Sequence, residues 1–250
     1  MRSTGNTILI TGGTSGIGRA LAERFHAGGN SVIIAGRRLA LLDEVTAANP
    51  GMAGYAVDMA DAGAFDGFVQ RLLTAHPALN VVIANAGIMR AEDASQRRDL
   101  SDAEEMVATN LLAPIRLIDA LVDHLSAQDD AAIVTVSSGL AFVPLAATPT
   151  YSATKAAIHS YSQSLRWQLK DRVEVIELAP PAVQTDLTPG QSTREGYMPL
   201  RAFIDEVMAL FAALPTPDEI RVSTLGFLRN AEAEGRFDAT FEALNMAYGK

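Results

Sequence analysis

Three side chains in residues 136–155 have the types and spacing that proton transfer needs. Tyr151 and Lys155 are four residues apart, so in a helix they would share one face, about one turn apart. A free tyrosine has a pKa of about 10, and a nearby ammonium group favours the phenolate and lowers that pKa. The phenol could then take a proton from an alcohol or give one to a carbonyl. Ser138 would hold the same oxygen from a strand end.

The scarcity of lysine supports a specific role for Lys155. The chain has 20 basic residues, but lysine occurs only at positions 155, 170 and 250. A chain that otherwise uses arginine keeps a compact ammonium group with a tunable pKa at position 155. The alternative is an unrelated helical pair, since this spacing is common, and the surrounding elements must decide between the two.

The first of these elements is an apolar run, residues 6–11, followed by a glycine-rich turn and an amphipathic stretch, residues 19–27. A strand, a glycine turn and a helix form the context of a dinucleotide-binding loop, although the spacing here is G-x-x-x-G-x-G. Glycines let the backbone approach a pyrophosphate, and the helix N-terminus offers free N–H groups. The alternative is a tight turn without a ligand. The expected cofactor contacts are Gly12, Thr14, Ser15, Gly16, Ile17 and Gly18.

The end of the second strand, residues 31–35, predicts the type of cofactor. An NAD-selective site places an acidic residue here to bind the ribose hydroxyls, but this chain has Arg37 and Arg38. Two arginines suit a 2′-phosphate, and no acidic residue occurs between positions 31 and 42. We therefore expect NADP(H) to be preferred over NAD(H), with Arg37 as the main contact and Arg38 either adding to it or facing solvent. The alternative is that both are surface charges at a helix start.

Further strands are expected near residues 55–57, 81–84, 131–137 and 173–178, with helices between them. This alternation predicts an α/β fold, a single Rossmann-type doubly wound parallel sheet of six strands, with a seventh left open and helices on both faces. One domain would span residues 1–250. Ligands of such sheets bind beyond the carboxyl ends of the strands. The residues at those ends are Gly12, Arg37, Asp58, Asn85, Ser138 and Pro180.

Three helical features are also expected. Ser101 and Glu104 would form a capping box at the start of a long helix that contains Asn110, and Pro114 should bend that helix. Residues 186–215 would form a substrate cap, whose helix either moves over the substrate or covers the end of the sheet. Another helix would start at residues 217–219, followed by a polar, helical tail.

The composition excludes several classes of function. The net charge of −9 argues against nucleic acid and membrane surfaces, and the lack of cysteine excludes disulfides and thiolate metal sites. The four histidines show no ligand spacing and are interpreted as helix-surface or loop residues, so no metal is expected. No signal peptide or membrane-span pattern is visible, which predicts a cytoplasmic protein.

With these residues in place, the chain resembles the short-chain dehydrogenase/reductase family over about residues 6–190. The matching motifs are Thr11-Gly12-x-x-x-Gly16-x-Gly18, Asn85-Ala86-Gly87, Asn110, Ser138 and Tyr151-x-x-x-Lys155. The resemblance implies that Tyr151 is the acid/base and that Ser138 orients the reacting oxygen. It implies that Lys155 binds the nicotinamide ribose and lowers the tyrosine pKa, and that Asn110 holds a water linking Lys155 to solvent.

The resemblance also implies cofactor contacts along the other strand ends. Asp58 would contact the adenine amino group, and Val183 and Thr185 would face the nicotinamide amide. Further implied contacts are Met59, Asn85, Ala86, Gly87 and Pro181. Two departures are visible: Pro180-Pro181 stands where many members have Pro-Gly, and the usual seventh strand with its glycine pair is not recognisable. Residues 137–144 and the tail further resemble a subgroup of oxidoreductases named for D-alanyl-lipoteichoic acid, a label that gives no substrate.

The leading hypothesis is an NADP(H)-dependent oxidoreductase that moves hydride between the cofactor and an alcohol/ketone pair. The alternatives are an epimerase or dehydratase on the same fold, or a non-catalytic dinucleotide-binding regulator. An apolar small-molecule substrate is expected from Met89, Leu140, Phe142, Pro144, Pro181, Leu187 and Met198, some of which would only fill the core. Apolar positions on several faces of the helices holding Asn110 and Tyr151 predict a homodimer or homotetramer.

Overall fold

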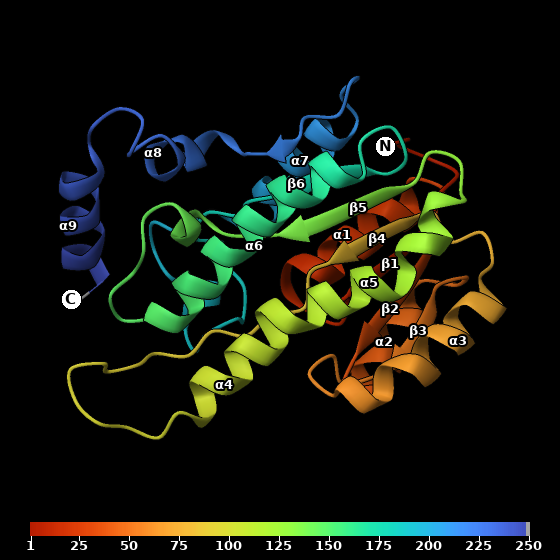
Figure 1. Cartoon of the computed structure of the whole chain (residues 1–250), viewed down its shortest axis with the longest axis horizontal. Helices are drawn as coiled ribbons and strands as arrows, with labels where there is room; N and C mark the ends of the chain where they lie inside the picture. The colour runs from red at the N-terminus through yellow and green to blue at the C-terminus, as the bar shows by residue number, and fades with distance from the viewer. Residues whose placement is uncertain (249–250) are drawn as a thin grey trace.

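Seven parallel strands form one sheet within residues 1–248, which the computed structural model describes (Figure 1). The strand order is β3-β2-β1-β4-β5-β6-β7, so the chain reverses its direction of travel across the sheet between β1 and β4. This is the doubly wound α/β sheet that the sequence predicts. The strands are β1 (Thr7–Thr11), β2 (Ser31–Gly36), β3 (Ala53–Ala56), β4 (Val81–Ala84), β5 (Ala132–Val136), β6 (Glu174–Leu178) and β7 (Glu219–Ile220).

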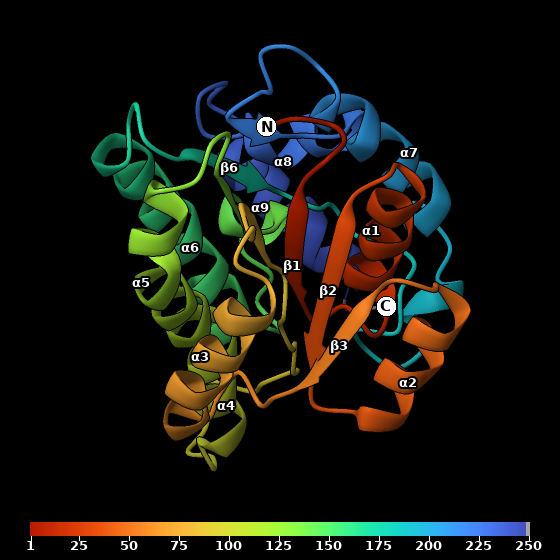
Figure 2. The same ribbon diagram turned by 90° about the vertical axis from the view of Figure 1, so that its right-hand side faces the viewer.

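Helices cover both faces of the sheet (Figure 2). Helices α1, α2 and α7 lie on one face, and α3, α4, α5 and α6 lie on the other. The short α8 and the C-terminal α9 follow β7 and lie beyond the carboxyl end of β5 (Figure 1). The helices are α1 (Gly16–Ala27), α2 (Leu39–Ala48), α3 (Phe65–Ala75), α4 (Ser101–Val107), α5 (Ala113–Ser126), α6 (Pro149–Gln168), α7 (Leu200–Phe211), α8 (Gly226–Arg229) and α9 (Phe237–Tyr248).

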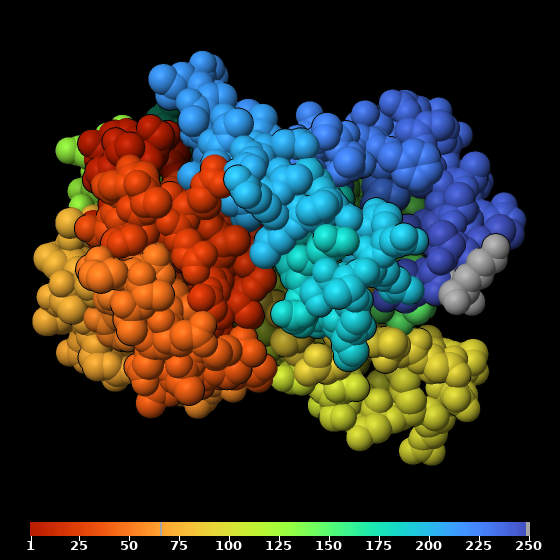
Figure 3. All heavy atoms as spheres, turned by 180° about the vertical axis from the view of Figure 1, so that it is seen from behind, coloured from red at the N-terminus to blue at the C-terminus, as the bar shows by residue number. Residues whose placement is uncertain are grey.

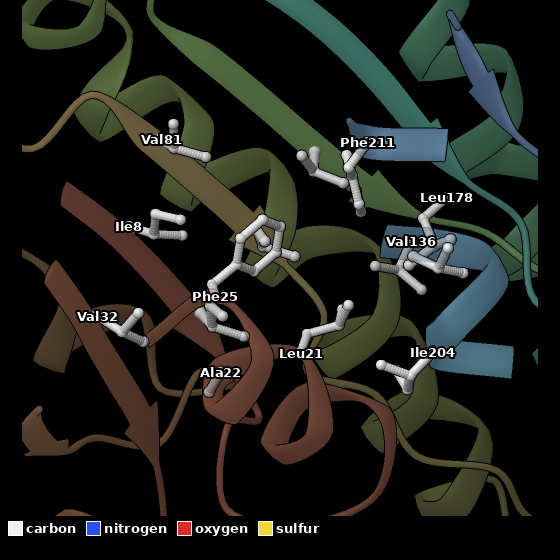
Figure 4. Close-up of a cluster of buried hydrophobic side chains, with 14 of the residues drawn as sticks. Ile8, Leu21, Ala22, Phe25, Val32, Val81, Val136, Leu178, Ile204 and Phe211 are labelled. Carbon is white, nitrogen blue, oxygen red and sulfur yellow. The ribbon is translucent and has the colours of Figure 1, made fainter. Parts of the chain in front are cut away.

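Two apolar cores separate the sheet from its helices. Strand residues alternate between them because successive side chains point to opposite faces: Ile8 and Ile10 enter one core and Leu9 enters the other. Helix α7 belongs to the first core, where Phe211 packs against Phe25 of α1 with ring centroids 5.5 Å apart (Figure 4). Helix α7 therefore covers the sheet, and a mobile cap remains a prediction.

The expected helix start at residues 217–219 is wrong, because this segment extends the sheet. The amide of Glu177 donates to the carbonyl of Asp218 over 2.9 Å, and Glu219 and Ile220 form β7 beside β6. The open question of a seventh strand is thereby answered. The strand has only two residues, which explains why its sequence shows no strand pattern.

The capping box at Ser101 is also wrong. Ser101 is the first helical residue, and its amide donates to the carboxylate of Asp99 over 2.9 Å. The expected bend at Pro114 takes the form of a wider, π-helical turn, Ala108–Leu112, between α4 and α5. Proline lacks an N–H group and crowds the preceding turn, so a wider turn before it removes the conflict. Asn110 lies in this turn. Residues 1–248 include no helix of the length and apolar character required to span a lipid bilayer.

Candidate active site

A cavity of about 730 Å³ opens at the carboxyl ends of the strands. Figure 3 shows this side of the molecule, where the cyan segment after β6 lies beside the red and orange N-terminal half, with the yellow segment after β4 below. The cavity is lined by all the cofactor-contact residues expected from the sequence: Gly12, Thr14, Ser15, Gly16, Ile17, Gly18, Arg37, Arg38, Asp58, Met59, Asn85, Ala86, Gly87, Tyr151, Lys155, Pro181, Val183 and Thr185. Segments that are far apart in the chain thus meet at one place.

The glycine turn packs tightly against the segment that follows β4. Gly12 has a φ of +68°, and a Cβ there would lie 2.9 Å from the Cα of Ala86. A Cβ on Gly18 would lie 2.3 Å from the carbonyl oxygen of Gly12. The side-chain amide of Asn85 donates to the carbonyl of Thr11 over 3.0 Å, which fixes the strand end. Close packing therefore requires glycine at positions 12 and 18, and the turn also borders the cavity.

The two arginines after β2 have different partners. Arg38 reaches back to the glycine turn, where its Nη2 donates to the hydroxyls of Thr14 at 3.1 Å and Ser15 at 2.8 Å. Arg37 extends to α4, where its Nη1 lies 3.3 Å from the carboxylate of Glu105. Arg38 therefore contacts the glycine turn, although it is an exposed residue, and its contact with a phosphate remains a prediction. Sequence reasoning missed Glu105, because it is far from β2 in the chain.

Tyr151, Lys155 and Ser138 lie together on the wall of the cavity. Helix α6 carries Tyr151 and Lys155 on one face, and the Lys155 Nζ lies 5.6 Å from the centroid of the Tyr151 ring. The Nζ donates to the carbonyl of Val136, at the end of β5, over 2.8 Å. Ser138 follows that strand end, and its hydroxyl accepts a hydrogen bond from the amide of Leu140 over 3.1 Å. The spacing predicted from the sequence is thus realised in space.

The pKa values of this pair differ from the sequence expectation. Burial raises the pKa of Tyr151 to about 12, and the hydrogen bond with Ser138 opposes that rise. Burial lowers the pKa of Lys155 to about 8. The expected lowering of the tyrosine pKa by Lys155 is therefore not found. Removal from water disfavours the charged form of both groups, and the ammonium is bonded to a backbone carbonyl.

Asn110 is buried in the π-helical turn and does not line the cavity. Its side chain forms two hydrogen bonds with the backbone of Ile88, accepting from the N–H over 2.9 Å and donating to the carbonyl over 2.8 Å. A Cβ on Gly87 would lie 3.3 Å from the Asn110 Oδ1 and 3.7 Å from the Lys155 Nζ. Asn110 thus positions the segment after β4 close to Lys155, and a bound water there remains a prediction.

Gln191 holds the segment that follows β6, and no motif pointed to it. Its amide donates to the carbonyl of Val183 over 2.8 Å and to the hydroxyl of Thr185 over 3.2 Å. Val183 also forms a parallel bridge with Met198. These contacts place Val183 and Thr185 on the cavity wall, although the preceding Pro180 and Pro181 donate no hydrogen bonds of their own.

The apolar residues expected around the substrate divide into two groups. Pro181 and Leu187 line the cavity, and Met89 belongs to an apolar cluster that includes Tyr151. Phe142 instead packs edge-on against His159, with ring centroids 4.8 Å apart, and Met198 packs against the core. Sequence reasoning missed Leu244 and Tyr248 of α9, which pack on the cluster around Tyr151. They lie in a tail that was interpreted only as polar and helical.

The interpretation of His159 as a surface residue is wrong. Its Nδ1 lies 2.8 Å from a carboxylate oxygen of Glu177, which is fully buried in β6. Ligand atoms of His159, Glu177 and Glu219 lie within 4.8 Å of one another, close enough to hold a metal ion. Arg229, however, binds both carboxylate oxygens of Glu219 at 2.9 Å. These residues therefore form a network of hydrogen bonds and ion pairs that already occupies these ligand atoms.

Comparison with known proteins gives the family. A family model described as short chain dehydrogenase matches residues 6–196. The chain belongs to this family. The family consists of oxidoreductases that bind a nicotinamide cofactor and act on alcohol and carbonyl groups of small molecules. The resemblance noted in the sequence is confirmed.

Among the relatives, the chain is 40% identical over 250 residues to the uncharacterized oxidoreductase DltE of Bacillus subtilis, covering 98% of both chains. It is 33% identical over 186 residues to a sulfoacetaldehyde reductase of Chromohalobacter salexigens, covering 72% of this chain and 74% of the relative. Among solved structures, a short-chain dehydrogenase from Burkholderia cenocepacia, in complex with NADP, has a TM-score of 0.83 at 23% identity and covers 98% of this chain and 99% of its own. A short-chain dehydrogenase from Streptomyces avermitilis has a TM-score of 0.82 at 22% identity, with 98% of both chains covered. These structures share the fold of this chain.

Proposed function

We propose that this protein is an NADP(H)-dependent oxidoreductase that transfers hydride between the nicotinamide and an alcohol/ketone pair, with Tyr151 as the general acid and base. The observation that carries the proposal is the meeting of Tyr151, Lys155 and Ser138 on one wall of the cavity that the glycine turn also lines. A proton donor, an oxygen-holding hydroxyl and a dinucleotide cradle are the parts that carbonyl reduction needs.

The cavity residues fit a dinucleotide. The turn from Gly12 to Gly18 and the N-terminus of α1 would hold the pyrophosphate, because backbone N–H groups and the helix dipole favour an anion there. The residues expected at the adenine are Asp58 and Met59, and those at the nicotinamide are Val183 and Thr185. When bound, the nicotinamide donates or accepts the hydride.

In the direction of reduction, the phenol of Tyr151 gives its proton to the carbonyl oxygen as that oxygen gains charge. With a pKa of about 12, the phenol is protonated at neutral pH, as a general acid must be, but it is a weaker acid than a free tyrosine. The Ser138 hydroxyl holds the same oxygen. The lowered pKa of Lys155 lets its ammonium lose and regain a proton near neutral pH, so Lys155 can take part in reprotonating the phenol.

The arginines support a preference for NADP(H). Four arginines line the cavity, and the described contacts pair three of them with carboxylates: Arg19, Arg37 and Arg90. The described contacts of Arg38 are to the hydroxyls of Thr14 and Ser15. A 2′-phosphate beside Arg38 and Ser15 would meet a guanidinium whose charge no described carboxylate offsets. We assign the phosphate to Arg38 together with Arg37. To bind the phosphate, Arg37 would break its ion pair with Glu105.

The substrate is proposed to be an apolar ketone or alcohol. Tyr151 belongs to a cluster with Ile88, Met89 and Leu145, and Leu187 packs on this cluster and also lines the cavity. A charged or heavily hydroxylated substituent would lose its hydration against this wall without compensating hydrogen bonds. Of the two alternative functions, an epimerase or dehydratase and a regulator, neither is favoured by a feature of the cavity.

We also propose that the protein self-associates through α5 and α6. Leu117, Ile118, Ile158 and Leu165 are buried within the chain itself, but Trp167 is 79% exposed. Leu112, at the end of the π-helical turn, is also exposed. Removing so large an exposed apolar side chain from water is favourable, so a second copy of the chain that covered Trp167 would gain binding free energy. Sedimentation at micromolar concentration should give a dimer or tetramer for the wild type and a monomer for Trp167→Glu.

The function is tested by following NADPH absorbance with purified protein and a panel of ketones and alcohols. The panel should pair each apolar ketone with an anionic or polyhydroxylated analogue of similar size. We expect turnover of apolar ketones with NADPH. Activity confined to the anionic or polyhydroxylated members would refute the substrate class, and the absence of oxidoreductase turnover across the panel would refute the proposed function.

A further inference from the structure

Helix α6 directs a third side chain toward the sheet, one turn beyond Lys155, where it meets β6. Tyr151, Lys155 and His159 are spaced four residues apart and so follow one face of the helix. His159 Nδ1 contacts both carboxylate oxygens of Glu177, at 2.8 and 3.0 Å. Because a carboxylate only accepts hydrogen bonds, the imidazole N–H is the donor. The outer nitrogen, Nε2, lies 3.1 Å from the side-chain amide of Gln163, so both ring nitrogens have partners.

The same carboxylate is bonded to the strand end that carries the active-site serine. The hydroxyl of Ser137 donates to Glu177, and the backbone N–H of Ser137 donates to the carbonyl of Leu178 over 2.9 Å. One residue earlier, the carbonyl of Val136 accepts from Lys155. One residue later stands Ser138. The residue immediately before the oxygen-holding serine is therefore fixed by its side chain as well as by its backbone.

A carboxylate at position 177 carries an energetic cost. Glu177 is fully buried in β6 among apolar neighbours such as Val175 and Ile176, and removing a carboxylate from water is unfavourable unless hydrogen bonds and a partner compensate. An apolar side chain would fill the same space without that cost. The contact of Glu177 with Ser137 supplies a reason for the acidic residue, because no apolar side chain could hold that hydroxyl.

The neighbouring charges do not offer Glu177 another partner among the described contacts. Glu219 of β7 lies close, but Arg229 binds both of its oxygens and Arg221 lies 3.6 Å away. Arg229 also contacts the ring of Phe142, with the guanidinium 4.7 Å from the ring centroid, and its charge acts on Glu177 without a described hydrogen bond or ion pair between the two. The described hydrogen bonds of the Glu177 carboxylate are those with Ser137 and His159.

We propose that His159 and Glu177 are positioning residues, which hold Ser137 and, through it, keep the Ser138 hydroxyl at the phenol of Tyr151. This proposal rests on the proposed function for its kinetic effect, although the geometric effect is independent of turnover. A displacement of about 1 Å at a reacting group can cost about a hundredfold in rate. Loss of the contact between Ser137 and Glu177 should therefore lower kcat and leave the affinity for the cofactor unchanged.

The test compares Ser137→Ala and Glu177→Gln with Ser162→Ala as a matched control. Ser162 is also a buried serine between α6 and β5, and its hydroxyl lies 2.6 Å from that of Thr135, so its removal disturbs the same interface away from residues 136–138. We expect a loss in kcat of about tenfold to a hundredfold for the two test variants and an unchanged kcat for the control. The dissociation constant for NADPH should stay the same in all three.

A double variant distinguishes a positioning role of Glu177, acting through Ser138, from a general role in stabilising the fold. In a Ser138→Ala background, Glu177→Gln should cause no further loss of kcat if it acts only through Ser138. A further loss of the same size as in the wild type would overturn the proposal. So would an equal loss of kcat in Ser162→Ala and Ser137→Ala.

Crystal structures of the wild type and Ser137→Ala test whether Ser137 positions the Ser138 hydroxyl, and they do not depend on an activity assay. We expect the Ser138 hydroxyl to move relative to the Tyr151 oxygen in the variant. An unmoved Ser138 in Ser137→Ala would overturn the proposal even if the protein proves to be an active reductase. A displaced Ser138 in a protein that reduces no ketone would support the positioning role and refute the proposed function alone.

Discussion

The guanidinium of Arg37, after β2, lies 3.3 Å from the carboxylate of Glu105 in α4. The same carboxylate lies 3.8 Å from Arg90, and all three side chains are at least one-third exposed. Exposed ion pairs of this kind contribute about 0–1 kcal/mol. A phosphate that binds Arg37 must therefore displace Glu105, and the free energy required is small but measurable.

Replacing Glu105 should strengthen NADPH binding. Glu105→Gln removes the competing charge, and a gain of up to 1 kcal/mol corresponds to a dissociation constant lower by up to about fivefold. NADH, which lacks the phosphate, should bind as before. Glu104→Gln is the matched control, because it removes the same charge one residue away on the exposed side of α4. Weaker NADH binding in Glu105→Gln would instead mean that Glu105 binds the ribose hydroxyls.

Removing the arginines should have the opposite effect. Arg37→Asp and Arg38→Ala are each expected to weaken NADPH binding by about tenfold to a hundredfold, since a charge-assisted hydrogen bond contributes about 1.5–3 kcal/mol. NADH binding should be equal or better in Arg37→Asp. Titrations with 2′-AMP and 5′-AMP separate the phosphate contact from the rest of the cofactor. Equal affinity of the wild type for NADPH and NADH would contradict the assignment.

Stability should depend on pH in two opposite ways. The pKa of Lys155 is about 8 in the folded protein, below its usual value of 10.5, so the unfolded chain binds more protons between these values and stability rises with pH there. The pKa of Tyr151 is about 12, above its usual value of 10.0, so stability falls as pH rises from 10 toward 12. Urea denaturation across this pH range should show a rise followed by a fall.

The variant Lys155→Met isolates the first effect. It should remove the rise above pH 8 and increase the free energy of unfolding at pH 7 by about 1–3 kcal/mol, because the buried ammonium is no longer desolvated. Activity should be lost at the same time. Lys170→Met, at an exposed lysine beside Trp167, is the control and should keep the wild-type dependence. A Lys155→Met protein that is less stable than the wild type at pH 7 would contradict the predicted cost of burying Lys155.

Local patterns in the sequence were sufficient for the residues that lie at strand ends. Gly12, Asp58, Asn85 and Ser138 each follow an apolar run, and parallel strands bring such positions to one edge of the sheet, so their meeting could be predicted. The position of β7 could not be predicted, because a strand of two residues is too short to show an alternating pattern of apolar and polar residues.

Hydrogen-bond and ion-pair partners that only tertiary packing brings together also could not be predicted from the sequence. Glu105, Gln191 and Glu177 act on residues of other elements, and nothing in their own neighbourhoods marks them. The pKa of Tyr151 was expected to fall because spacing shows the nearby ammonium, whereas the burial that raises the pKa depends on the whole fold. Proximity along a helix was thus easier to predict than desolvation.

The measurement that bears most directly on the central claim is single-turnover reduction of an apolar ketone by Tyr151→Phe with NADPH. The hydroxyl is the only group removed, so NADPH should bind as in the wild type while the rate falls by about a hundredfold to ten-thousandfold, the usual contribution of general acid–base catalysis. A Tyr151→Phe variant that reduces the ketone at close to the wild-type rate would contradict the account.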